Sequence, residues 1–185
     1  YKNIPHEWVV RGSWNIEEFS KLAKLPLIPL VVTPSDEVLQ DSTPIIEHIE
    51  SQHPSPSIHP EDESLKFISA LIEEYGDEWG NKLMFHFRWW HSADRNACAR
   101  VLAYSRIVGD DEEEIEKVTD SIAERMVTRR YFTGSSKDNA PLIKRYLNEL
   151  LSLLEEHLSS HRYLLGERPA FADFGLAPQI YELAS

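Results

Sequence analysis

Asp41 and Ser42 have the residue types and the position to bind a charged ligand. They stand where an extended segment gives way to a helical pattern. A helix start offers free backbone amides, and with a hydroxyl beside them it binds carboxylates and phosphates readily. An aspartate at the same place can pair with a ligand ammonium group. The alternative is ordinary N-capping by either side chain, which stabilises a helix by about 1 kcal/mol. For an isolated Asp-Ser pair, capping is the more common case.

Ile28 and Pro29 are the second pair with a special geometry. They open a predicted strand, where proline is unusual because it donates no ladder hydrogen bond. A cis bond would expose the backbone of Ile28 at the sheet edge, although only about 5–6% of bonds before proline are cis. A proline at the first position of a strand explains the same pattern. The residues alone leave both alternatives open.

The elements that would position these residues form a short mixed region. In order, we predict a strand, a helix, two strands joined by a hairpin, and a helix, at residues 6–11, 16–23, 28–32, 37–40 and 41–52. Asn15 and Glu18 have the spacing of a capping box at the start of the first helix. In Thr33–Asp36, proline occupies the second position of a tight turn, where its fixed φ fits.

The character of the chain changes near residue 60. The segment HPSPSIHP contains three prolines and two serines and is typical of a linker. Beyond it, helical patterns predominate, at residues 61–91, 110–130 and 142–158 and from 172 onward. The acidic run at the start of 110–130 favours a helix start, because negative charge complements the helix dipole. We therefore predict an α/β domain at 1–53, a linker at 54–61 and an all-helical domain at 62–185.

Charge and composition exclude several classes of protein. The chain has 19 basic and 31 acidic residues, a formal net charge of −12, which argues against nucleic-acid binding. No apolar run approaches the roughly 18 residues of a membrane span, so we expect a soluble protein with no membrane partner. Cys98 is the single cysteine and cannot form an internal disulfide. A single cysteine fits a reducing, cytoplasmic location.

Taken together, these segments resemble the glutathione transferase superfamily. Its thioredoxin-like βαββα domain carries a cis-proline after an apolar residue, a β-hairpin, and an acid- or amide-Ser pair that opens a helix. Ile28-Pro29 and Asp41-Ser42 occupy those places, followed by the helix residues PIIEHI. The stretch YLLGERPAFAD, residues 163–173, resembles the signature of the family's helical domain, although Ala170 replaces the usual Ser or Thr.

The resemblance implies roles for single residues. The backbone of Ile28 would hold the cysteinyl part of glutathione, with Pro29 shaping that contact. Ser42 and its amide would bind the γ-glutamyl carboxylate, and Asp41 would face the γ-glutamyl ammonium, with Gln40 as a weaker neighbour. Asp173 resembles the family's buried capping acid, which serves folding rather than catalysis.

The implied protein is a cytoplasmic, homodimeric detoxification enzyme without a metal. It would bind glutathione as a co-substrate and present the thiolate to a small apolar electrophile. Conjugation, dehalogenation, isomerisation and thiol reduction are all compatible with the residues. The alternative is a non-catalytic interaction or dimerisation module of the same fold; an intact Asp41-Ser42 pair favours the enzyme.

One part of the family pattern is missing from this sequence. The family begins with a strand and a helix that carry the activating Tyr, Ser or Cys, whereas Tyr1–Pro5 resembles the end of that first helix. The sequence also ends at Ser185, where the pattern places a core helix. We therefore expect a fragment of a longer protein, with the catalytic residue unknown and N-terminal to Tyr1.

Other side chains with chemical potential have simpler interpretations. Residues 85–91 (FHFRWWH) are densely aromatic, and the corresponding family helix lines the electrophile cleft. His86 and Trp90, four residues apart, are the pair we predict to contact a substrate, although most members of such a cluster pack in a core. His157 and His161 have chelating spacing but lack an acidic context, so we expect no metal site. Cys98 is expected to be a small buried residue.

Overall fold

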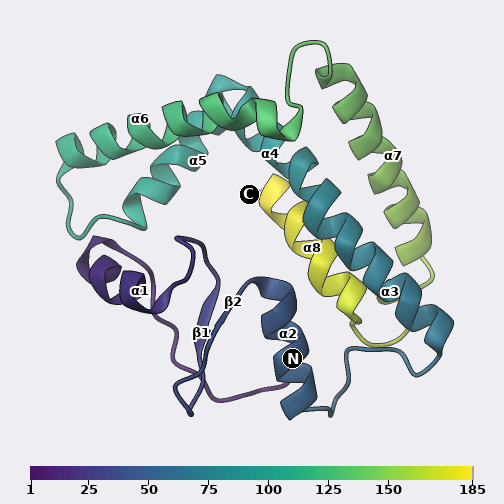
Figure 1. Cartoon of the computed structure of the whole chain (residues 1–185). Coiled ribbons are helices and arrows are strands. Elements are labelled where there is room, and N and C mark those ends of the chain that lie inside the picture. Colours follow the sequence, from purple (N-terminus) through teal and green to yellow (C-terminus); the bar gives the residue numbers. More distant parts are fainter. Residues whose placement is uncertain (185) are drawn as a thin grey trace. The chain divides into compact units, whose positions relative to one another are not determined.

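The computed structural model describes residues 1–184, which form two compact units (Figure 1). One comprises Tyr1–Ser57 with Ser105–Gly109, and the other comprises Ile58–Tyr104 and the chain from Asp110 onward. The first unit is mixed α/β and the second is helical, which is the change of character that the sequence predicts. Ser185, the last residue of the predicted helical domain, lies outside the described residues.

The α/β unit is built around one β-hairpin. A 3₁₀ turn, two helices and two strands make up its regular structure: Ser13–Asn15, α1 (Ile16–Leu22), β1 (Leu30–Val32), β2 (Val38–Gln40) and α2 (Ser42–Gln52). The strands are antiparallel, with Leu30 opposite Gln40 and Val32 opposite Val38. The predicted turn closes them, because the amide of Asp36 donates to the carbonyl of Thr33 at 3.0 Å.

The predicted strand at residues 6–11 is wrong, since this segment has no regular secondary structure. Trp8 is 82% exposed, and Val9 and Val10 are exposed as well. A strand is stable only when its amides and carbonyls pair with a neighbouring strand. Within residues 1–184 the sheet contains β1 and β2 alone, so this segment lacks a ladder despite its favourable composition.

The predicted capping box at Asn15 is also wrong. The side chain of Asn15 makes no capping hydrogen bond to α1. Its Oδ1 instead accepts from the amide of Gly12 at 2.9 Å, and its Nδ2 donates to the carbonyl of Val10 at 3.0 Å. Asn15 ends the 3₁₀ turn that precedes α1, and this turn brings the backbone of Val10 and Gly12 within reach of its side chain. These local hydrogen bonds replace the cap.

The helical unit begins with one continuous helical segment, made of α3 (Glu63–Tyr75), a π-helical turn (Gly76–Gly80) and α4 (Asn81–Trp90). Five more elements follow among the described residues: α5 (Ser92–Tyr104), α6 (Glu112–Arg129), a 3₁₀ turn (Arg130–Thr133), α7 (Ala140–Leu158) and α8 (Phe171–Ala184). The helices predicted from periodicity are therefore confirmed, with the π-helical turn as an unpredicted feature inside the first.

Small residues allow α3 and α8 to pack closely side by side (Figure 1). Ser69 is fully buried, and its hydroxyl accepts from the amide of Ala172 at 3.0 Å. A Cβ added to Gly76 would lie only 2.6 Å from the carbonyl oxygen of Gly175. The face of α3 away from this contact carries exposed apolar side chains. We call this set the α3 apolar row: Phe67, Ile68, Leu71 and Tyr75.

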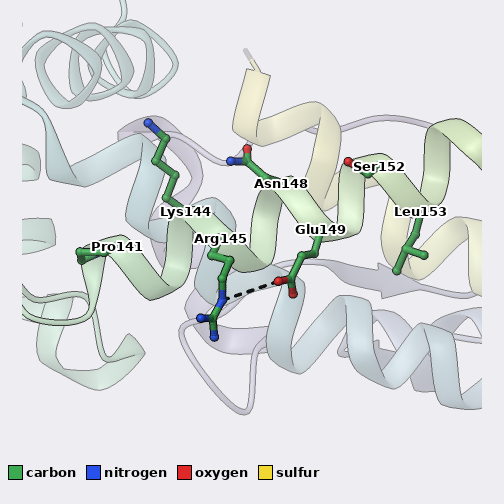
Figure 2. Close-up of a pocket in the computed structure, with 7 residues that line it drawn as sticks. All are labelled: Pro141, Lys144, Arg145, Asn148, Glu149, Ser152 and Leu153. Atoms are coloured by element: carbon green, nitrogen blue, oxygen red, sulfur yellow. Dashed lines mark ion pairs between the residues drawn. The ribbon is translucent and has the colours of Figure 1, made fainter.

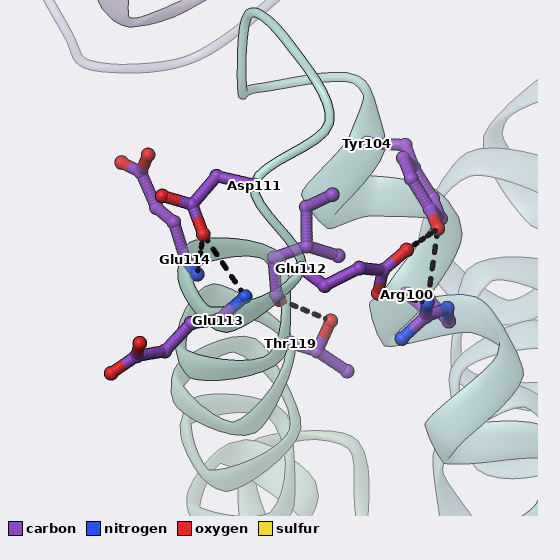
Figure 3. Close-up of polar contacts among 8 residues, drawn as sticks. Arg100, Tyr104, Asp111, Glu112, Glu113, Glu114 and Thr119 are labelled. Atoms are coloured by element: carbon purple, nitrogen blue, oxygen red, sulfur yellow. Dashed lines mark hydrogen bonds and ion pairs between the residues drawn. The ribbon is translucent and has the colours of Figure 1, made fainter.

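The acidic run at the start of α6 acts as a helix start, as the sequence predicts (Figure 3). Asp111 is the N-cap, and its carboxylate accepts from the amides of Glu113 and Glu114 at 3.1 and 3.2 Å. Glu112 forms an ion pair with Arg100 of α5 at 2.7 Å. Capping of α6 and an ion pair between α6 and α5 therefore account for Asp111 and Glu112 in this run.

Candidate functional site

The hairpin register brings the two predicted ligand-binding pairs to one place. Leu30, the first residue of β1, lies opposite Gln40, the last residue of β2. Pro29 therefore precedes one strand where Asp41 follows the other, and both pairs lie at the open end of the hairpin. The Ile28–Pro29 peptide bond is cis, which is one of the two arrangements that the sequence allows, and the Ile28 side chain is exposed.

Asp41 has a backbone and side-chain arrangement that ordinary capping does not explain. Its φ of 81° is rare for a residue with a side chain, and its carboxylate makes no capping hydrogen bond to α2. Ser42 is the first residue of α2 and is partly buried. A helix start beside an exposed carboxylate offers hydrogen-bond donors for a carboxylate and a negative charge for an ammonium group. That combination suits the α-amino acid end of a peptide.

The side-chain amide of Gln40, which the resemblance implies to be a weaker neighbour of the ligand, is occupied by backbone groups of this chain. The side chain hydrogen-bonds the backbone of residues 24–27, immediately before the Ile28–Pro29 pair. The sequence reasoning missed this role. A glutamine at a strand end carries no signal for it, because the partners are backbone groups of a distant segment.

His86 and Trp90 lie together within the helical unit. Their rings stack with centroids 5.1 Å apart, and the imidazole Nδ1 is 2.7 Å from the hydroxyl of Ser135. The Arg130 guanidinium lies 5.1 Å from the centroid of the Trp90 ring. His86 is buried, and burial is the main cause that lowers its pKa, followed by the nearby charges of His91 and Arg130. These contacts hold α4 to the segment after α6. They are all contacts within the protein, and contact of either ring with a substrate stays a prediction.

Asp173 serves folding in the way that the resemblance implies. One carboxylate oxygen accepts from the amide of Ala170 at 2.8 Å, and the other accepts from the amide of Leu164 at 3.0 Å. The residue therefore caps α8 and joins the preceding loop to it. Ala170 lacks the hydroxyl of the usual Ser or Thr, but these two hydrogen bonds form without it.

The described residues contain no group of three or more His, Cys, Asp or Glu side chains arranged to hold a metal ion. The rings of His157 and His161 stack with centroids 4.4 Å apart, and Nε2 of His157 is 2.9 Å from the carbonyl oxygen of Leu164. Cys98 is buried in α5. Over the same residues, no helix combines the length and the apolar character needed to cross a bilayer.

A surface hollow runs along α7, and Figure 2 shows the side chains that line it. They are Pro141, Lys144, Arg145, Asn148, Glu149, Ser152 and Leu153. Arg145 and Glu149 form an ion pair at 3.6 Å. All the lining residues come from a single helix, and none is a predicted site residue. A ligand site normally encloses most of its ligand, so this open hollow adds no candidate site.

Comparisons with known proteins agree with the geometry of both units. Residues 1–52 match the family model for the N-terminal domain of glutathione S-transferase, and residues 110–184 match the model for its C-terminal domain. A crystal structure of a glutathione S-transferase from Rhodospirillum rubrum F11 is similar in fold, with a TM-score of 0.60 and 15% sequence identity. The alignment covers 98% of this chain and 68% of that chain. No curated protein matches this chain.

Proposed function

Because this chain belongs to the glutathione S-transferase superfamily, we propose that it binds glutathione and presents the thiolate to a small apolar electrophile. The observation that supports the proposal is the open end of the hairpin, where the Ile28–Pro29 pair and the Asp41–Ser42 pair meet. One pair would bind the cysteinyl backbone of the tripeptide, and the other would bind its γ-glutamyl end.

Each group at the hairpin end matches one part of glutathione. Ser42 and the first amides of α2 would receive the γ-glutamyl carboxylate, since a helix start stabilises negative charge. The exposed carboxylate of Asp41 would pair with the γ-glutamyl ammonium. The backbone of Ile28 would bind the cysteinyl unit through strand-like hydrogen bonds. Anchoring the tripeptide at these points orients its thiol, and orientation is a large part of catalysis between two bound reactants.

We also propose that the protein forms a homodimer, with the α3 apolar row in the interface. The row places four large apolar side chains on one face of a helix, and Phe67 and Leu71 are 66% and 55% exposed. Contiguous apolar surface of this kind typically marks an interaction site. A cytoplasmic location and a role in detoxification are part of the same proposal.

The proposal is tested by calorimetric titration of reduced glutathione into the protein and into Ser42→Ala. We expect micromolar to millimolar binding by the wild type and a loss of about tenfold or more in the variant, since a hydrogen bond to a charged group contributes about 1.5–3 kcal/mol. Ser51→Ala is the matched control, because Ser51 is exposed in the last turn of α2 and its hydroxyl bonds only groups of that turn, the carbonyl of His48 and the side-chain amide of Gln52.

A folded wild-type protein that gives no heat and no competition with glutathione would contradict the proposal. Equal weakening by Ser42→Ala and Ser51→Ala would place the binding site elsewhere. If the wild type binds glutathione and Ser42→Ala weakens that binding, the wild-type protein is the one to screen for activity with electrophiles.

A further inference from the structure

The segment Lys24–Leu27 connects α1 to the Ile28–Pro29 pair without regular secondary structure. Leu25 and Leu27 are 58% and 59% exposed, so apolar burial does little to hold the segment in place. Its internal order includes one tight turn, in which the amide of Leu27 donates to the carbonyl of Leu25 at 2.7 Å. Polar contacts must therefore supply much of what keeps this exposed segment in one conformation.

Gln40 supplies those contacts with its side-chain amide. Oε1 accepts from the amides of Lys24 and Leu25 at 3.1 and 3.2 Å. Nε2 donates to the carbonyls of Leu25 and Leu27 at 2.6 and 2.8 Å. These are two donors and two acceptors, the full capacity of a primary amide. Only this orientation of the amide matches donors to carbonyls and acceptors to amides.

Gln40 can act as a fixed support because its own backbone lies in the hairpin. It pairs with Leu30 at the end of the ladder, and Asp41 follows it directly. Arg11 reinforces the same segment, with its guanidinium donating to the carbonyl of Pro26 at 3.2 Å and lying over the Phe19 ring. The segment is thus bound to the strand end that also leads to the helix start.

We propose that Gln40 is a positioning residue for glutathione binding, which it promotes through residues 24–27 and not by touching the ligand. This inference rests on the proposed glutathione function. Its amide holds the segment that leads directly into Ile28, and so sets where the Ile28 backbone meets the cysteinyl unit. One side chain thereby aligns the two halves of the site, one before β1 and the other after β2.

The main test uses Gln40→Glu, with Gln52→Glu as the matched control. The substitution replaces the Nε2 donors by a carboxylate oxygen facing two carbonyls, whereas Gln52 is exposed at the end of α2 and its amide contacts Ser51. We expect glutathione affinity at pH 7.5 to fall about tenfold or more in Gln40→Glu and to stay unchanged in Gln52→Glu.

The pH profile separates positioning from a general structural effect. The carboxyl group that Gln40→Glu introduces regains one O–H donor when it is protonated, so the ratio of wild-type to variant affinity should narrow as the pH falls from 7.5 to 5. Taking the ratio at each pH cancels the titration of glutathione itself. Gln40→Met keeps the length of the side chain but has no charge and no hydrogen-bonding amide. If Gln40→Glu fails to fold, Gln40→Met repeats the comparison of glutathione affinity with the wild type at pH 7.5. The melting temperature of Gln40→Met verifies that this variant is folded.

Amide hydrogen exchange tests the contact without any ligand. The amides of Lys24 and Leu25 should be protected in the wild type and lose protection in Gln40→Met. Free exchange of both in the wild type would overturn the inference, as would wild-type affinity for glutathione in folded Gln40→Met. If the wild type protects these amides but binds no glutathione, the proposed function fails, and the positioning role fails with it, while the contact itself stands.

Discussion

Asp41 holds a backbone conformation that costs free energy and lies beside the proposed ligand. Its φ and ψ are 81° and 137°, a region that side-chain-bearing residues rarely adopt and that costs on the order of 1–3 kcal/mol. Strained residues of this kind cluster at binding sites. The arrangement implies that stability is sacrificed at Asp41 to place its carboxylate beside the start of α2.

We predict that Asp41→Gly stabilises the fold by about 1 kcal/mol, since glycine adopts positive φ without strain but gains entropy when unfolded. The same variant should weaken glutathione binding, because the carboxylate is lost. Urea unfolding and calorimetry measure the two effects. Asp36→Gly is the control: Asp36 also has positive φ, 62°, but lies in the hairpin turn, so it should gain stability without losing affinity. Reduced stability in Asp41→Gly would disprove the strain.

The α4 helix is held to the segment after α6 by a buried histidine. Burial lowers the pKa of His86, so the native state binds a proton less readily than the unfolded chain, whose histidine titrates near 6.5. When the unfolded state binds more protons, stability rises with pH. The contribution of His86 is therefore fully present above about pH 6.5 and is lost as the pH falls below it.

We predict that the free energy of unfolding falls less steeply between pH 7.5 and 5.5 in His86→Asn than in the wild type, because asparagine does not titrate. Ser135→Ala is the matched comparison: it removes the partner at 2.7 Å but keeps the imidazole, so it should be less stable and still retain the pH dependence. Denaturant unfolding at several pH values measures this. Identical pH profiles for wild type and His86→Asn would rule out the contribution.

For the whole molecule, the α3 apolar row is the proposed interface of a homodimer. We predict that Leu71→Glu shifts a homodimer towards monomer by at least about tenfold in dissociation constant, since a charge in an apolar interface is costly to desolvate. Sedimentation equilibrium measures the shift. Leu153→Glu is the control, because Leu153 is a similarly exposed leucine, at 65%, on a different helix, α7. A monomeric wild type, or a dimer unaffected by Leu71→Glu, would refute this interface.

Local patterns predicted the elements whose stability depends on nearby residues. The helices at α3, α6 and α7 followed from apolar periodicity and from the acidic start of α6. The hairpin turn followed from Pro34 in its second position. The prediction of a strand at residues 6–11 was wrong because the stability of a strand depends on residues that are not nearby in the sequence. Its composition favours a strand, but a strand also requires partners that are distant in the sequence.

Motifs and local patterns were enough to identify the family, the order of the α/β and helical regions, and the residue types suited to a glutathione site, because each of these is encoded over a short stretch of sequence. The contacts and backbone conformations of Gln40, Asp41 and His86, in contrast, became known from the folded structure. Gln40 binds a backbone segment more than a dozen residues away, Asp41 takes a positive φ, and His86 bonds Ser135 across the helical unit. Those contacts depend on where the folded backbone places groups that are remote in sequence, and no local pattern encodes that placement.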